Sequence, residues 1–148
     1  MRWNAAFLLF GALMSAACPT LLWAAGECPQ IRTTPAAPAE FLVMSNPVPS
    51  NEESLKAGEH LYQLRGKPVT CQTCHGRNGD GISESAYEKI PAPRNFTCAE
   101  TMNTLADGQL FWIIRNGSPH TAMYPFPAFS DKQVWQLVHY LRRFLKPQ

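Results

Sequence analysis

Two cysteines and a histidine stand close together in the segment Cys71-Gln72-Thr73-Cys74-His75. About one helical turn separates the two thiols, so both sulfur atoms would reach one edge of a porphyrin ring. The histidine directly follows the second cysteine, so its neutral imidazole would lie beneath a metal ion at the centre of that ring. This spacing is the attachment pattern of c-type haem, and it predicts Cys71 and Cys74 as covalent attachment points and His75 as an iron ligand.

Two other kinds of site use the same residue types. A structural zinc site needs a second Cys/His pair at ligand spacing, and none follows. A thioredoxin-like redox pair needs a βαβ pattern, and none surrounds the motif. We therefore expect one covalently attached haem c.

The N-terminal segment 1–26 has the pattern of an export signal. Met1-Arg2 is positively charged, residues 3–26 carry no charged side chain, and small residues at 24–26 offer a cleavage point. Two alternatives remain open. The stretch is long enough to stay as a membrane anchor, although Pro19 interrupts it, and Cys18 follows a poor match to a lipoprotein cleavage box. All three place the folded part outside the cytoplasm, so we expect a periplasmic protein, with a membrane tether under either alternative.

A Pro-rich leader at 27–50 precedes a single domain at 51–148. The five prolines of the leader exclude a long helix or a central strand. Once the motif cysteines are assigned to haem, only Cys28 and Cys98 remain outside the signal. An even pair in an oxidising compartment is usually a disulfide. The alternatives are a flexible linker with free thiols, or a bond from Cys28 to another molecule.

The domain shows helical patterns and no useful strand alternation, so we predict an all-α fold with helices packed around the haem. A first helix should run from a capping box at Ser50–Glu53 to about Leu64. A middle helix should begin with Asp107 as its cap and end at Asn116-Gly117. A second capping box at Ser130–Gln133 opens the last helix. That helix has an apolar stripe of Val134, Leu137, Val138, Leu141 and Leu145, with Lys132, Gln136, Arg142, Arg143 and Lys146 expected mainly on the solvated side.

The region from about Glu52 to Lys146 resembles a class I, single-haem bacterial cytochrome c. The resemblance implies that the first and last helices cross, with Gly58 and Tyr62 facing the side of the last helix that bears Trp135 and Tyr140. Other motifs that carry it are CxxCH with Gly76, Gly79-Asp80-Gly81, Pro91 to Phe96, Trp112 to Gly117, Met123, and Ser130 to Arg142. The leader and Cys98 lie outside the family pattern.

The resemblance also implies Met123 as the sixth iron ligand, in the loop before the last helix. A thioether opposite the histidine raises the reduction potential and favours electron transfer. The family often has proline directly after this methionine, whereas Tyr124 stands here, so the local path differs. His120 remains an alternative ligand, and a packing role for Met123 remains the other alternative. His60 and His139 are expected at exposed or interfacial positions.

Residues around the haem can be proposed from their types. Arg94 and Arg115 are candidates for contacts with the haem propionates, because buried carboxylates need a partner; solvated surface positions are the alternative. The backbone carbonyl of Pro91 or Pro93 is expected to accept a hydrogen bond from His75. Pocket packing is expected mostly from Phe111, Trp112, Tyr124, Phe126 and Phe129.

Composition and charge narrow the range of functions that the chain can have. The chain has 13 Lys+Arg against 11 Asp+Glu and no basic run, so nucleic acid is not expected as a partner. Three functions remain: a one-electron carrier that docks transiently on donor and acceptor redox proteins, a haem subunit of a larger periplasmic or membrane-attached oxidoreductase, and an enzyme or gas sensor with an open sixth position. The methionine ligand and the lack of an acid–base pair favour electron transfer over an enzyme.

Overall fold

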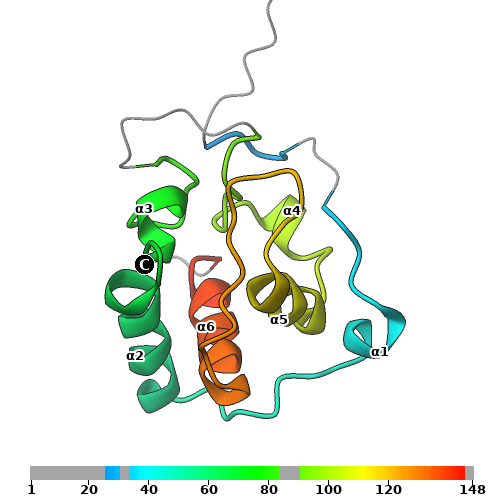
Figure 1. Ribbon diagram of the computed structural model, residues 1–148, viewed down its shortest axis with the longest axis vertical. Helices are drawn as coiled ribbons and strands as arrows, with labels where there is room; N and C mark the ends of the chain where they lie inside the picture. The colour runs from blue at the N-terminus through cyan, green and yellow to red at the C-terminus, as the bar shows by residue number, and fades with distance from the viewer. Residues whose placement is uncertain (1–25, 31–33, 84–90, 146–148) are drawn as a thin grey trace, which may run out of the picture.

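The computed structural model describes residues 26–30, 34–83 and 91–145, and all regular structure among them is helical. The prediction of an all-α fold is confirmed (Figure 1). The elements are α1 (Ala39–Leu42), α2 (Glu52–His60), the π-helix η1 (Leu61–Arg65), α3 (Cys71–His75), α4 (Ala99–Met102), α5 (Asp107–Asn116) and α6 (Asp131–Arg143). None of the helices in these ranges is long and apolar enough to span a bilayer. The predicted export signal lies almost wholly outside the described residues.

Helices α2 and α6 lie side by side and form the main helix pair (Figure 1). Gly58 makes their close approach possible, because a Cβ atom there would lie 2.3 Å from the Gln136 carbonyl oxygen and 2.8 Å from the Tyr140 Cβ atom. The buried Tyr62 ring, in η1, lies 5.4 Å from the Tyr140 ring between centroids. The crossing expected from Gly58 and Tyr62 is therefore present, with Tyr140 as the aromatic partner.

Trp135 has a different neighbour from the one expected. Its ring stacks on Phe111 of α5 with 4.4 Å between centroids, so it joins α6 to α5 rather than to α2. Four residues of the stripe predicted for α6 are buried, with Val134 and Val138 at 0 % exposure, whereas Leu145 lies beyond the end of the helix and is partly buried. Gln136 was wrongly expected on the solvated side: it is 7 % exposed, because the close approach of α2 covers it.

The helix ends follow local side-chain chemistry, with two corrections. Asn51, not Ser50, caps α2: its side chain accepts a hydrogen bond from the Ser54 backbone N–H. The capping box at Ser130 is confirmed, with both reciprocal hydrogen bonds to Gln133 present. Asp107 makes no capping bond and instead accepts from Arg142 at 2.8 Å, so Arg142 joins α6 to the start of α5 rather than pointing into solvent.

The described part of the leader lies against the helical domain. Helix α1 packs on α5, where Gly108 leaves room for the Phe41 carbonyl oxygen, which would lie only 1.7 Å from a Cβ atom at that position. Farther along the leader, the Asn46 side-chain amide donates to the Trp135 carbonyl oxygen at 2.9 Å. Cys28 and Cys98 are joined by a disulfide with 5.4 Å between their Cα atoms. The leader is thus attached to the domain at several separate points.

Candidate haem site

The residues of the CxxCH motif form a short helix of their own, α3. Because Cys71, Cys74 and His75 stand at helical spacing, their side chains lie on one side of that helix and line one pocket. Gly76 ends the helix at a φ of 78°, and a Cβ atom there would lie 2.4 Å from Asp80 Oδ1. The Gly76 carbonyl oxygen accepts a hydrogen bond from the buried Tyr62 hydroxyl at 2.6 Å, so η1 holds the end of α3 in place.

The pocket beside α3 is mainly apolar and partly open to solvent. The walls come from α3, α5, α6, the loop at 91–98, the loop before α6 and one leader residue. They include Cys71, Cys74, His75, Thr34, Arg94, Phe96, Leu110, Ile113, Ile114, Met123, Tyr124, Phe126, Leu137 and Leu141. Two thiols, an imidazole and a thioether within apolar walls fit a covalently bound haem.

The orientation of His75 is set by a backbone carbonyl. Its Nδ1 lies 3.0 Å from the Arg94 carbonyl oxygen, which can only accept, so Nδ1 carries the proton and Nε2 is the nitrogen assigned to iron. The acceptor is therefore Arg94, and the prediction of Pro91 or Pro93 was wrong. The imidazole also stacks on Phe96, with 4.5 Å between ring centroids; Phe96 was not among the predicted pocket aromatics.

Burial raises the pKa of the Cys71 thiol to about 12. Before haem is attached, this thiol is therefore uncharged at neutral pH.

Met123 reaches the same pocket from the loop between α5 and α6. The loop folds back on itself: the Ser118 backbone N–H donates to the Met123 carbonyl oxygen at 3.1 Å. Gly117, with a φ of 73°, allows this, because a Cβ atom there would lie 2.8 Å from the same oxygen. His120 is exposed and does not line the pocket. These positions favour Met123 over His120 as the sixth ligand.

The predicted aromatic residues divide between the pocket and the core. Tyr124 and Phe126 line the pocket. Phe129 stacks on Phe126 with 5.5 Å between ring centroids, and Phe111 packs against Trp135. Phe129 thus supports a residue of the pocket wall, whereas Phe111 belongs to the core between α5 and α6.

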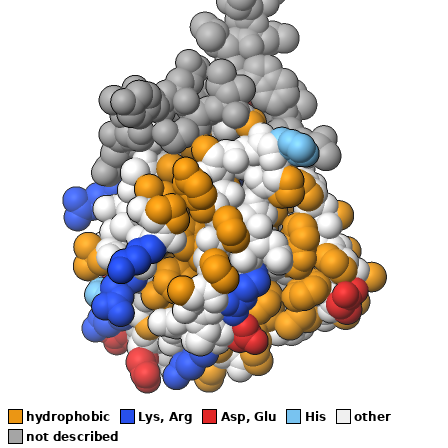
Figure 2. All heavy atoms as spheres, in the orientation of Figure 1, with side chains coloured by type: hydrophobic (Ala, Val, Ile, Leu, Met, Phe, Trp, Pro, Cys, Tyr) orange, Lys and Arg blue, Asp and Glu red, His pale blue; other side chains and the backbone are white. Residues whose placement is uncertain are grey.

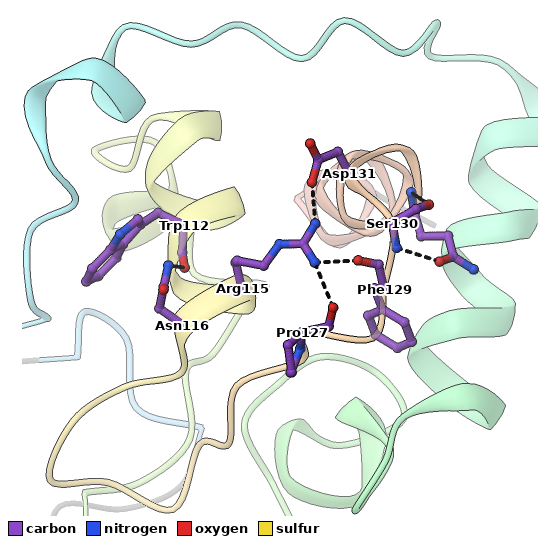
Figure 3. Close-up of polar contacts among 8 residues, drawn as sticks. Trp112, Arg115, Asn116, Pro127, Phe129, Ser130 and Asp131 are labelled. Atoms are coloured by element: carbon purple, nitrogen blue, oxygen red, sulfur yellow. Dashed lines mark hydrogen bonds and ion pairs between the residues drawn. The ribbon is translucent and has the colours of Figure 1, made fainter.

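The two candidate arginines lie in different places. Arg94 is 8 % exposed and lines the pocket, where its guanidinium donates to Thr34 Oγ1 at 2.6 Å. Arg115 is absent from the lining: its guanidinium donates to the carbonyl oxygens of Pro127 and Phe129 and pairs with Asp131 (Figure 3). Arg94 therefore remains the candidate for a propionate, whereas Arg115 ties the end of α5 to the loop before α6.

A helical domain with CxxCH at an apolar pocket defines a c-type cytochrome domain. The family model described as cytochrome c oxidase, cbb3-type, subunit III matches residues 53–141, and the chain belongs to this family. Haem c and a role in electron transfer follow at the level of the family.

Solved structures contain a similar fold. A chain from the Kuenenia stuttgartiensis reducing HAO-like protein complex aligns with a TM-score of 0.57 and 24 % identity, over 71 % of this chain. The aligned part is 49 % of that chain, so this protein spans about half of its length. At this identity the likeness supports the fold alone. No curated protein matches the sequence.

Proposed function

We propose that this chain is a periplasmic one-electron carrier with a single, covalently attached haem c in six-coordinate His/Met ligation. The observation that carries the proposal is the convergence of Cys71, Cys74, His75 and Met123 on one apolar pocket. A bound haem would supply a ferric/ferrous couple. The chain would hold it through two thioether bonds, ligate the iron on both faces and keep water away. A filled sixth position favours electron transfer over chemistry on a bound molecule, so we assign no enzymatic reaction.

The surface beside the pocket suits brief contact with a redox partner. On the face shown in Figure 2, hydrophobic side chains lie in several groups across the surface, and Lys and Arg side chains lie at the left, at the lower edge and between these groups. Tyr124, next to the assigned ligand Met123, is 51 % exposed. Exposed aromatic side chains are typical of protein interfaces, and charges near them mainly speed and orient docking.

A second function, as the haem subunit of a larger oxidoreductase, is favoured by one observation: the family description names an oxidase subunit. The leader would then serve as the arm that attaches the domain to its complex. Mild solubilisation followed by size-exclusion chromatography separates the two functions. A carrier elutes alone, whereas a subunit co-elutes with its partner proteins.

The test of the proposed function is the behaviour of the exported protein on a denaturing gel and in the spectrometer. Haem should remain on the polypeptide after acid–acetone extraction, and the ferric form should show the weak red-end band of methionine–iron ligation. Haem that washes out would refute covalent attachment. N-terminal sequencing of the same sample tests cleavage near residue 26, and recovery in the periplasmic fraction tests the location.

A further inference from the structure

The carbonyl that orients His75 belongs to the loop between residues 91 and 98, which contains no helix. Within the domain this loop is held by the Phe96 backbone N–H, which donates to the Gly79 carbonyl oxygen at 2.6 Å. Additional contacts come from the leader, although the leader has no counterpart in the family pattern described above. The disulfide between Cys28 and Cys98 joins the leader to the C-terminal end of this loop.

One leader side chain bonds to the backbone on both sides of Arg94. The Gln30 amide nitrogen donates to the Pro93 carbonyl oxygen at 2.8 Å, and the Gln30 amide oxygen accepts from the Asn95 backbone N–H at 2.8 Å. Because a side-chain amide has a donor and an acceptor, it can meet both groups at once. Gln30 therefore fixes the path of the chain through Arg94.

The bond from the Asn95 N–H to Gln30 involves the same peptide group whose carbonyl oxygen accepts from His75. The Asn95 N–H and the Arg94 carbonyl are the two ends of one planar peptide group, and they point in opposite directions. Gln30 holds the N–H end, while the carbonyl end accepts from His75 Nδ1 at 3.0 Å. A hydrogen bond to a peptide N–H polarises the group and makes its carbonyl a stronger acceptor.

Neighbouring leader residues support the same arrangement. The Asn95 side-chain amide donates to the Gly26 carbonyl oxygen at 3.0 Å. The Arg94 guanidinium donates to Thr34 Oγ1 at 2.6 Å. These bonds join residues separated by 60 positions or more in the sequence, so the leader and the loop form one hydrogen-bonded unit.

We propose that Gln30 is a positioning residue for the haem iron, acting through the Arg94–Asn95 peptide group on His75. The proposal rests on the proposed function in one respect, which is that His75 ligates the iron. A strong hydrogen-bond acceptor held in place at Nδ1–H makes the imidazole more basic and a better electron donor to the metal. This stabilises ferric over ferrous iron, so Gln30 keeps the reduction potential lower than the domain would have without it.

The test is the midpoint potential of purified holoprotein variants, measured by equilibrium redox titration. Gln30→Ala removes these two bonds and a longer one, in which the Arg94 guanidinium donates to the Gln30 amide oxygen at 3.4 Å. Gln30→Met does the same while retaining side-chain volume. We expect both to favour the ferrous state by up to about tenfold, the scale of one lost hydrogen bond, and a tenfold change equals an upward shift of 59 mV for one electron. Gln30→Glu retains an oxygen acceptor for the Asn95 N–H, so its potential should equal that of the wild type or fall below it.

The matched control is Gln63→Ala. Gln63 is another partly buried glutamine, but its side-chain amide nitrogen lies 3.2 Å from Glu59 Oε1 on the preceding helical turn, and it does not line the pocket. Its substitution should leave the potential unchanged. A thermal melt of each variant separates a loss of stability from a change in ligation. Lower stability alone would not raise the potential of the two apolar variants while leaving that of Gln30→Glu at or below the wild-type value.

Each outcome decides the proposal. A wild-type potential in Gln30→Ala or Gln30→Met overturns it, as does a shift in Gln63→Ala of the same size. If neither apolar variant retains haem, Gln30→Asn decides, because its shorter amide cannot reach both backbone groups: a potential above the wild-type value supports the proposal, and an unchanged one refutes it. Failure of the proposed function is seen separately, because the wild-type protein would then show no covalent haem.

Discussion

Replacing Gly58 with alanine tests the close contact between α2 and α6 that supports one side of the haem pocket. Alanine would bring a Cβ atom to 2.3 Å from the Gln136 carbonyl oxygen and 2.8 Å from the Tyr140 Cβ atom. Both obstacles are fixed to the α6 backbone, so neither can rotate away. The helices would have to separate by roughly 1 Å, which forfeits about a quarter to a half of the dispersion energy across the contact.

Two opposing terms set the size of the effect. Alanine is favoured over glycine within a helix by about 1 kcal/mol, whereas overpacking a well-packed core typically costs about 1–3 kcal/mol. Because the clash is with backbone in the main helix pair, we place its cost at or above the upper end of that range. The expected net destabilisation is about 2 kcal/mol, or a fall of roughly 10 °C in the melting temperature of a domain this size.

Thermal unfolding of the holoprotein, followed by far-ultraviolet circular dichroism, measures this change. Ala57→Gly is the matched control, since it lies on the same helix and changes helix propensity alone by about 1 kcal/mol in the unfavourable direction. Gly58→Ala should destabilise the protein more than Ala57→Gly does. A melting temperature at or above that of the wild type would show that α2 and α6 do not approach as closely as the structure indicates.

Three further predictions concern the ligand, the disulfide and the end of the haem-binding helix. Met123→Ala should abolish the methionine–iron band and let the ferrous form bind carbon monoxide, while His120→Ala should leave the spectrum unchanged; the reverse result would exchange their roles. Cys28 and Cys98 are 70 residues apart, so on the chain-entropy model their disulfide should stabilise the fold by about 4 kcal/mol. Intact-mass analysis with thiol alkylation, before and after reduction, checks the bond, and two alkylatable thiols in the non-reduced exported protein would exclude it. Tyr62→Phe removes a buried hydroxyl that donates to a backbone carbonyl at 2.6 Å, so urea unfolding should show a loss of about 1–3 kcal/mol, and an unchanged midpoint would contradict that bond.

The predictions that held from sequence concern features whose geometry is local. CxxCH brings two sulfur atoms and an imidazole to one side of a helical turn wherever that helix forms, because the helix repeat itself sets their spacing. The capping box at Ser130 and the end of α5 at Gly117 are likewise fixed by residues a few positions apart. The apolar stripe of α6 marks its buried side before any partner helix is known.

The predictions that failed, or that sequence did not make, depend on contacts between distant segments. The acceptor for His75 is Arg94 and not a proline, because the path of the loop is fixed by the leader as well as by the haem domain. Arg115 meets Asp131 instead of the pocket, and Trp135 meets Phe111 rather than α2. Composition and spacing identify the residue types that need partners, such as a guanidinium or a large ring. Which partner each one receives is decided by how the helices pack, since the packed core leaves each side chain only the neighbours within its reach.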